Sequence, residues 1–340
     1  HGHNPQYPEF GLLMGYMNRM AALLAGKHVA PAAVLYHAEA EWSGDYMFTQ
    51  KPAAQLARHC IDYDIVPADY LTGADLAEGQ LRVNGEDFRT LVIPYAQALP
   101  AALLQKIAAW TAAGLPVWFV DGLPVRTCEG TPLPDLSGAR VVALAELADA
   151  LADAGIPELR LTAPAPYLRY YHARQADGDV YFFVNEGTTP LHTAVEGARP
   201  GQAVVYDAFT NTLAAEERPF TLDLPAFGVK CVLVPDLPVD APAALSFIGA
   251  RQLALFPAEV RFADAETGST QYGAPVALDG WQPVDTLPGM AAFAGRIRYR
   301  LTVTLDEAQA AVPARLVLTG VQEGAAVTVN GQDCSTRIGA

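Results

Sequence analysis

Residues 89–122, RTLVIPYAQALPAALLQKIAAWTAAGLPVWFVDG, carry the clearest structural pattern in the sequence. Two runs within this stretch, RTLVIPY at 89–95 and PVWFVDG at 116–122, are apolar on both faces, which is typical of strands buried in a parallel sheet. Between them, residues 100–114 have apolar side chains at helical spacing, a proline in the first turn and a glycine at the end. The stretch therefore predicts a strand, a helix and a second strand.

The same alternation continues on both sides of this stretch. Upstream, residues 10–25 predict a helix that ends at Gly26, and VAPAAVLYH at 29–37 predicts a further buried strand. The helical run KPAAQLARHC and the extended run IDYDIVPADYL follow, and ARVVAL and AELADALADAG give a later strand and helix. We therefore predict an open three-layer α/β domain over residues 28–162.

From Leu168 the apolar residues recur with a period of two, which predicts antiparallel strands. LRYYHARQADGDVYFFVNEG at 168–187 is a hairpin, and further short strands complete a small antiparallel β-sandwich over residues 163–238. A proline-containing linker leads to a second all-β part at 239–340, in which Asn330-Gly331 suits a two-residue turn. This part predicts a partial jelly-roll β-sandwich, so the fold class is α/β plus all-β.

Composition and charge restrict the class of partner. The chain is 51% hydrophobic and 17% charged, which favours compact folds, and its net charge of −15 repels nucleic acid and anionic lipid surfaces. No apolar stretch reaches the roughly 18 residues that a membrane span needs. We predict no nucleic-acid partner and no membrane partner.

The sequence contains no motif for a cofactor or a metal. The GxxxxGK and GxG-type loops that bind phosphates are absent, so a nucleotide cofactor is not predicted. The four cysteines form no CxxC pair and suggest neither a zinc site nor a disulfide framework: Cys60, Cys128, Cys231 and Cys334. Isolated thiols favour a cytoplasmic over a secreted location, although the sequence does not establish localisation.

Four ordered segments resemble a known domain: VAPAAVLYHAEAEW, HCIDYDIVPADYL, LRVNGEDFRTLVIPYAQALP and IAAWTAAGLPVWFVDG. Together they are similar to the trimerisation domain of family 42 β-galactosidases, which has the fold of class I glutamine amidotransferases without their activity. The resemblance covers about 130 residues and implies a flavodoxin- or amidotransferase-like α/β domain. It also makes this domain a candidate for joining subunits into a homo-oligomer.

Residues 279–331 resemble the sugar-binding jelly roll of family 2 glycoside hydrolases. The shared features are Trp281, a strand from Gly295 to Tyr299, and a hairpin with Val327, Val329, Asn330 and Gly331. The combination of the two modules also occurs in bacterial α-L-rhamnosidases and in uncharacterised relatives.

These resemblances imply the C-terminal region of a multidomain glycosidase that acts on glycans or oligosaccharides. Such enzymes carry their catalytic carboxylates on a (β/α)₈ barrel, so residues 1–27 are expected to be the end of that barrel and its last helix. The resemblance predicts a carbohydrate substrate, catalytic carboxylates upstream and no activity of this chain alone. A non-catalytic carbohydrate-binding or oligomerisation module is the alternative.

The first candidate substrate contacts are Glu39, Glu41 and Trp42. They follow a predicted strand at the edge where open α/β sheets bind ligands, and Trp42 offers an apolar face to a sugar ring. If the strand continues, the two glutamates point the same way, which suits substrate contact better than catalysis across a glycosidic bond. A solvated loop is the alternative.

The N-terminal residues are the second candidate contacts. In the barrel interpretation His1, His3 and Asn4 hydrogen-bond sugar hydroxyls and Tyr7 packs on a ring, whereas a terminal polar stretch is otherwise flexible. His1 and His3 lack a third ligand with recognisable spacing, so no metal site is predicted.

Two further features do not predict a site. Cys128 lies roughly where an amidotransferase carries its nucleophile, but RTCEGT lacks the small flanking residues of a nucleophile elbow. Asp62, Asp64 and Asp69 lack the glycine and the glutamate of an EF-hand loop, and we interpret them as strand-end and surface carboxylates.

Overall fold

The computed structural model describes residues 7–243, 251–264, 271–318, 321 and 324–338. It shows a mixed α/β chain with several sheets and few helices, as the sequence predicted. The larger of two compact units comprises residues 21–207 and 211–243, and the smaller comprises the remaining described residues. The domain boundaries after residues 27, 162 and 238 stay predictions. None of the described helices is long and apolar enough to cross a membrane.

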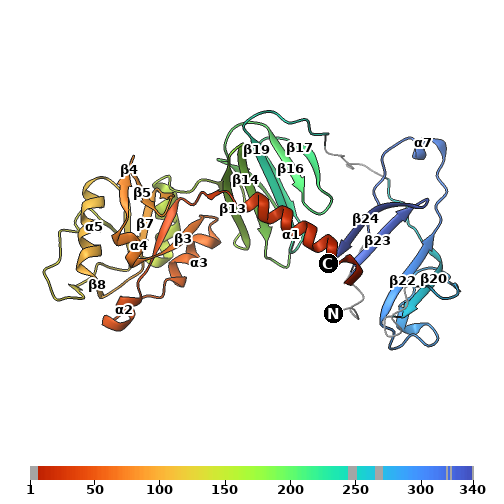
Figure 1. The fold of residues 1–340 in the computed structure, drawn as a ribbon, viewed down its shortest axis with the longest axis horizontal. Coiled ribbons are helices and arrows are strands. Elements are labelled where there is room, and N and C mark those ends of the chain that lie inside the picture. Colours follow the sequence, from red (N-terminus) through yellow and green to blue (C-terminus); the bar gives the residue numbers. More distant parts are fainter. Residues whose placement is uncertain (1–6, 244–250, 265–270, 319–320, 322–323, 339–340) are drawn as a thin grey trace. The chain divides into compact units, whose positions relative to one another are not determined.

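A five-stranded sheet with parallel neighbours forms the centre of the α/β part of the larger unit (Figure 1). Its strands are β2 (Ala32–Tyr36), β3 (Tyr63–Pro67), β7 (Thr90–Ile93), β9 (Val117–Val120) and β11 (Arg140–Val142). They lie in the order β3-β2-β7-β9-β11. The chain therefore moves to one side of the sheet after β2 and to the other side after β7, and the carboxyl ends of β2 and β7 are adjacent.

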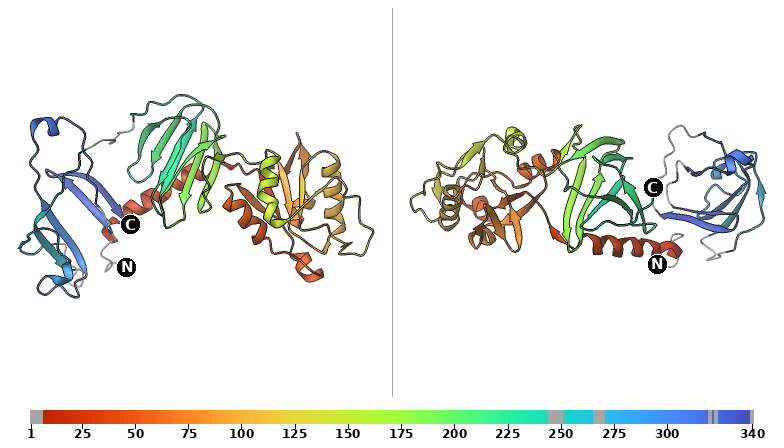
Figure 2. Two further views of the ribbon diagram at one scale, coloured as in Figure 1. Left: turned by 180° about the vertical axis from the view of Figure 1, so that it is seen from behind. Right: turned by 90° about the horizontal axis from the view of Figure 1, so that it is seen from above.

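Helices cover both faces of this sheet (Figure 2). On one face, α3 (Gln50–Arg58) and α6 (Leu147–Asp153) bury Leu56 and Leu151 against the strands. On the other, α4 (Ala68–Thr72) and α5 (Ala101–Ala112) bury Leu71 and Leu104. The helical spacing in the sequence thus identified the helix faces that enter the core, and Trp110 and Trp118 are also buried there.

The α/β part also contains several shorter strands. Between β3 and β7 the chain forms an antiparallel sheet of β4 (Asp75–Ala77), β5 (Gln80–Val83) and β6 (Glu86–Phe88), which we did not predict. Its second turn, at Asn84 and Gly85, has φ values of 49° and 90°, the positive values of a type I′ turn. The pair β8 (Ala98–Leu99) and β10 (Arg126–Thr127) is parallel.

The rest of the larger unit is a sandwich of two antiparallel sheets, in the orders β1-β13-β14-β19-β16-β17 and β12-β15-β18. Its strands are β1 (Lys27–His28), β12 (Arg160–Leu161), β13 (Leu168–Gln175), β14 (Gly178–Asn185), β15 (Leu191–Glu196), β16 (Ala203–Asp207), β17 (Thr212–Glu216), β18 (Thr221–Leu224) and β19 (Val229–Pro235). Aromatic side chains of Tyr181, Phe183 and Phe220 fill its core. The predicted hairpin at 168–187 is confirmed as β13 and β14.

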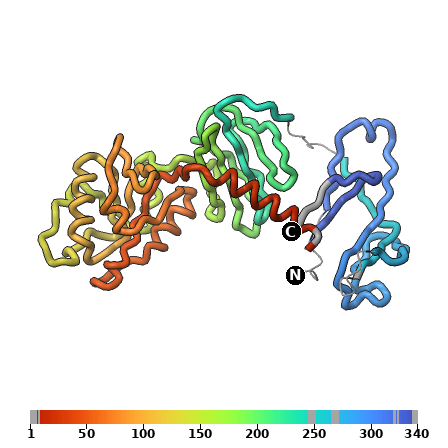
Figure 3. The backbone as a smooth tube through the Cα atoms, in the orientation of Figure 1, coloured from red at the N-terminus to blue at the C-terminus, as the bar shows by residue number. Residues whose placement is uncertain are grey.

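Strand β1 links the sandwich to the α/β part. Figure 3 follows the chain from α1 (Phe10–Leu24) through β1 towards β2. β1 pairs with β13, and the Val29 N–H donates to the His172 carbonyl at 2.9 Å. Gly26 precedes this pairing, and a Cβ there would lie 2.5 Å from the Arg174 carbonyl oxygen. The close approach of the two backbones therefore requires glycine at this position.

The smaller unit is mainly antiparallel. It contains η1 (Tyr7–Glu9), β20 (Pro257–Asp264), β21 (Val276–Ala277), η3 (Val284–Thr286), β22 (Gly295–Leu301), α7 (Glu307–Ala310), β23 (Gly324–Val329) and β24 (Gln332–Ile338). β20 pairs with both β21 and β22, and β23 pairs with β24. Asn330 and Gly331, between β23 and β24, have φ values of 52° and 84°, as predicted for a type I′ turn. The jelly-roll assignment stays a prediction.

Candidate functional site

The predicted contacts Glu39, Glu41 and Trp42 lie on a short helix, α2 (Ala38–Ser43). This corrects the expectation of a continued strand, because residues two apart on a helix point to nearly opposite sides. Glu39 and Glu41 therefore do not present a shared face. Trp42 is 83% exposed, so its indole is open to solvent beside the carboxyl end of β2.

The N-terminal candidates are described only in part. His1, His3 and Asn4 lie outside the described residues. Tyr7 is half exposed in η1, and its ring stacks on Phe10 with a centroid distance of 6.3 Å. A role for these four residues in sugar binding stays a prediction.

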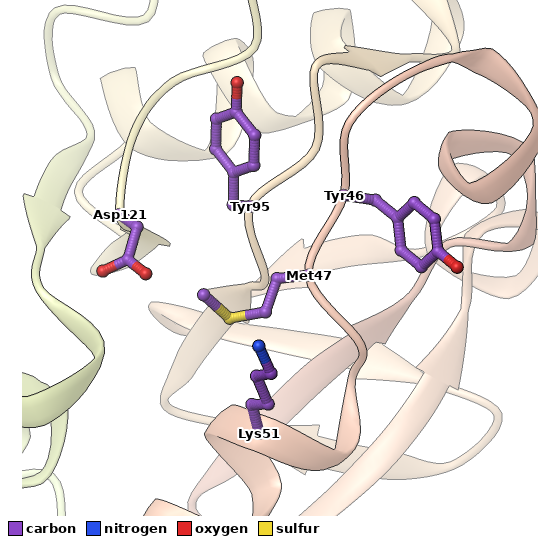
Figure 4. Close-up of a pocket in the computed structure, with 5 residues that line it drawn as sticks. All are labelled: Tyr46, Met47, Lys51, Tyr95 and Asp121. Atoms are coloured by element: carbon purple, nitrogen blue, oxygen red, sulfur yellow. The ribbon is translucent and has the colours of Figure 1, made fainter.

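A recess of about 380 Å³ lies at the carboxyl edge of the parallel sheet (Figure 4). Tyr46, Met47 and Lys51 follow β2, Tyr95 follows β7 and Asp121 follows β9. In Figure 4 Met47 lies between Lys51 and Tyr95, and the Tyr46 ring points away from Asp121. The recess is thus assembled from segments that leave neighbouring strands in different directions, which is where open α/β sheets bind ligands.

Backbone pairing holds the floor of the recess. The Met47 N–H donates to the Tyr95 carbonyl at 2.8 Å, and Tyr46 forms a β-bridge with Ala96. The Gln97 N–H then donates to the Asp45 carbonyl at 2.7 Å. Because the segments after β2 and β7 are paired in this way, the buried Met47 side chain has a fixed position beneath the opening.

Asp121 has an unusual backbone conformation for a residue with a side chain. Its φ is +62°, in the left-handed region, which aspartate enters more readily than most residues. Its N–H donates to the Val142 carbonyl at 2.8 Å, and its Oδ1 accepts from the Leu144 N–H at 2.8 Å, where η2 (Leu144–Glu146) begins. Among the described residues Oδ2 makes no hydrogen bond, so one carboxylate oxygen can receive a ligand.

Lys51, Tyr95 and Asp121 were not among the predicted site residues. The sequence contained a partial signal, because Tyr95 and Asp121 come directly after the two strands predicted within residues 89–122. Their convergence depends on the strand order, which the sequence does not specify. Lys51 had no signal beyond its place at the start of a predicted helix.

A second recess, of about 390 Å³, lies between α4 and the β5–β6 turn. It is lined by Asp69, Tyr70, Gly73, Ala74, Arg82, Val83 and Asn84. Like the first, it contains one carboxylate residue. Among the described residues no group of three histidine, cysteine, aspartate or glutamate side chains could bind a metal ion.

Cys128 and Glu129 have structural contacts. The Glu129 Oε2 accepts from the Ala101 N–H at 2.8 Å and so caps the first turn of α5. The Cys128 Sγ lies 3.7 Å from the Ser43 Oγ. The His59 Nδ1 hydrogen-bonds to the Gln55 carbonyl at 2.8 Å.

His37 is buried at the junction of β2 and α2. Neither of its ring nitrogens has a hydrogen-bond partner of good geometry among the described residues. Burial lowers the pKa of this imidazole and outweighs the opposing effects of nearby carbonyls and of Glu39 and Glu41. His37 is therefore neutral at pH 7.

An ion-pair cluster joins β1 to the parallel sheet. The His28 Nε2 donates to the Asp62 Oδ2 at 2.9 Å, its Nδ1 lies 3.1 Å from the Asp64 Oδ2, and its ring stacks on Tyr171. A histidine that donates from both nitrogens must be protonated. Burial alone would lower the pKa of His28, but the two carboxylates raise it to about 10. Asp62, directly before β3, and Asp64, within it, are therefore ion-pair partners of His28 and not solvated surface carboxylates.

A second network stabilises the sandwich around buried Asp179. Its carboxylate accepts from the His172 Nε2 at 2.8 Å and the Arg174 guanidinium at 2.7 Å, and it contacts the Arg199 Nε at 2.5 Å. The Nδ1 of His172 lies 2.8 Å from the Glu158 carboxylate. Burial opposes protonation of His172, but these carboxylates outweigh it and raise the pKa of the ring. Both ring nitrogens of His172 therefore face carboxylates.

Comparisons with known proteins relate the fold to carbohydrate-active enzymes. No family model matches the sequence, and no curated protein matches it. The structure is similar to a rhamnosidase from Novosphingobium sp. PP1Y, with a TM-score of 0.69 and 18% identity over 97% of this chain and 34% of that one. It is also similar to a β-galactosidase from Bacillus circulans sp. alkalophilus, with a TM-score of 0.50 and 12% identity over 69% of this chain and 46% of that one. At these identities the likeness establishes the fold, and this chain spans 34% of the rhamnosidase.

Proposed function

We propose that this chain is an accessory region of a glycoside hydrolase, whose catalytic carboxylates lie outside it. The observation that carries the proposal is the extent of the structural similarity: 97% of this chain is similar to 34% of a rhamnosidase. A chain that corresponds almost entirely to a minor portion of a glycosidase suits a supporting role next to the catalytic domain.

The chemistry of the described residues supports an accessory role. Hydrolysis of a glycosidic bond needs two carboxyl groups that face each other across that bond. Each described recess has one carboxylate residue, Asp121 in the first and Asp69 in the second. Glu39 and Glu41 point to different sides of α2.

The finer domain assignments belong to the same proposal. The strand order β3-β2-β7-β9-β11 supports an amidotransferase- or flavodoxin-like α/β domain at residues 28–162, because it corresponds to 2-1-3-4-5 in chain order. In this proposal residues 163–238 form the small sandwich and residues 239–340 a sugar-binding jelly roll. The partner is a carbohydrate substrate, and the candidate contacts are His1, His3, Asn4, Tyr7, Glu39, Glu41 and Trp42.

Assays on aryl glycosides test the proposal. The isolated 340-residue chain is expected to give no turnover of aryl α-L-rhamnosides or aryl β-D-galactosides above the uncatalysed rate, because it lacks a facing carboxylate pair. The full-length gene product is expected to hydrolyse at least one of them. Spectrophotometric release of the aryl alcohol measures both. Turnover by the isolated chain contradicts the accessory role.

A second candidate role is the assembly of identical subunits through the α/β domain. Several large apolar side chains are exposed at the carboxyl end of β2 and in the segments that follow β2 and β9: Tyr36, Trp42, Phe48, Leu123 and Val125. Apolar side chains gathered at one edge are typical of protein interfaces. A second copy of this chain is the partner we propose for them.

Sedimentation velocity tests subunit assembly. The Trp42→Ser, Val125→Asp double variant is expected to weaken self-association by at least about 30-fold, because truncation of a buried interface aromatic costs about 2 kcal/mol or more. Tyr167→Ser is the matched control, since Tyr167 is also a large exposed aromatic but precedes β13 in the sandwich. A wild-type chain that stays monomeric at all concentrations excludes the role.

A further inference from the structure

The recess beneath Tyr95 and Asp121 has the position and size of a small-ligand site. It opens at the carboxyl ends of β2, β7 and β9, at the point where the strand order changes direction. Its volume of about 380 Å³ is at the lower end of the range of roughly 300–1,000 Å³ for ligand sites. This space suits one sugar-sized ring better than an oligomer.

Two of the lining residues contradict local structural preferences. Lys51 occupies the first turn of α3, where the helix dipole disfavours a cation. Asp121 has a φ of +62°, which costs conformational energy in a residue other than glycine. Local conflicts of this kind concentrate at functional sites, and here both lie in one recess.

The chemistry of the lining favours a neutral, polyhydroxylated ligand. The Lys51 ammonium donates hydrogen bonds and the Asp121 Oδ2 accepts them. Met47 supplies an apolar floor for the carbon-bound hydrogens of a ring. The charges of Lys51 and Asp121 cancel, and a chain with a net charge of −15 disfavours phosphates and other anions.

We propose that the recess binds a single neutral pyranose, at a site separate from the one that cleaves the glycosidic bond. The choice of a sugar over other polyhydroxylated molecules rests on the proposed function. In this site the hydroxyls of the ring donate to the Asp121 Oδ2 and accept from Lys51, while Tyr95 and Met47 contact its apolar face.

Calorimetric titration of the 340-residue chain with L-rhamnose and with D-galactose tests the site. Asp121→Asn is expected to weaken binding about tenfold, because it removes a charge-assisted acceptor but keeps the Oδ1 that accepts from Leu144 and tolerates the left-handed φ. Lys51→Met, which stays compatible with a helix, is expected to have a similar effect. Asp69→Asn in the second recess is the matched control and is expected to leave the affinity unchanged.

Two outcomes overturn the inference: neither sugar binds the wild-type chain, or binding is unaffected by both Asp121→Asn and Lys51→Met. Circular dichroism verifies that each variant is folded, and the two recess variants give independent answers. Hydrolysis by the full-length gene product is measured separately. If neither sugar binds while the full-length gene product still hydrolyses a glycoside, this site alone is refuted. If a sugar binds but the full-length gene product hydrolyses neither glycoside, the proposed function alone is refuted.

Discussion

Replacement of His28 by glutamine is expected to lower the free energy of unfolding of the larger unit by about 2–4 kcal/mol at pH 6.5. The substitution removes the cation between Asp62 and Asp64, whose oxygens lie 2.9 and 3.1 Å from the imidazole nitrogens, and leaves two carboxylates near each other. Burial raises the pKa of Asp62, so part of the favourable pairing is offset by desolvation of that carboxyl. Urea unfolding, followed by the fluorescence of buried Trp110 and Trp118, measures the loss.

The contribution of His28 to the free energy of unfolding is expected to decrease as the pH rises. The pKa rises from 6.5 to about 10 on folding, so the folded chain binds the proton more tightly. The stabilisation is complete below pH 6.5, decreases as the pH rises from there, and is lost above about pH 10. The stabilities of the wild-type chain and of His28→Gln are therefore expected to converge between these values.

His192→Gln is the matched control for His28. His192 also pairs with an aspartate, Asp223, but the two side chains are 76% and 73% exposed. An ion pair in water contributes little, so a change within about 0.5 kcal/mol is expected. If His28→Gln and His192→Gln cause equal losses, or if the His28 difference does not shrink at alkaline pH, the ion-pair explanation is wrong.

The central strands and helices could be predicted because the apolar pattern of each lies within its own short stretch of sequence. Buried parallel strands are apolar on both faces and alternate with amphipathic helices, so residues 89–122 specify their own secondary structure. The hairpin at 168–187 is similarly local, since both strands and the turn lie within one segment. Short elements are different. α2 has six residues, too few for helical spacing to be distinguished from the alternation of a strand.

The long-range features could not be predicted from the sequence. β1 contains two residues, Lys27 and His28, and its pairing with β13 joins positions more than 140 residues apart. His28 also contacts Asp62 and Asp64, more than 30 residues further along the chain, so the structural role of these carboxylates depends on tertiary contacts. The recess has the same origin, because its residues meet only after the strands take the order β3-β2-β7-β9-β11.

Asp179→Ala is expected to lower the free energy of unfolding of the larger unit by about 3–5 kcal/mol. Asp179 is 4% exposed, and its carboxylate is the shared partner of His172, Arg174 and Arg199. Its removal leaves cationic groups in a buried setting with fewer acceptors, which costs more than the pairing itself contributes. Urea unfolding with the same tryptophan signal measures the effect.

Asp236→Ala is the matched control, because Asp236 binds the same two arginines, at 2.8 Å from Arg174 and 2.7 Å from Arg199. Its side chain is 34% exposed, so water can replace the lost carboxylate, and a much smaller loss than for Asp179→Ala is expected. The comparison therefore separates the effect of burial from the effect of pairing. Equal losses in the two variants would mean that the arginines find other acceptors once Asp179 is gone. In that case the burial of Asp179 does not determine its contribution to stability.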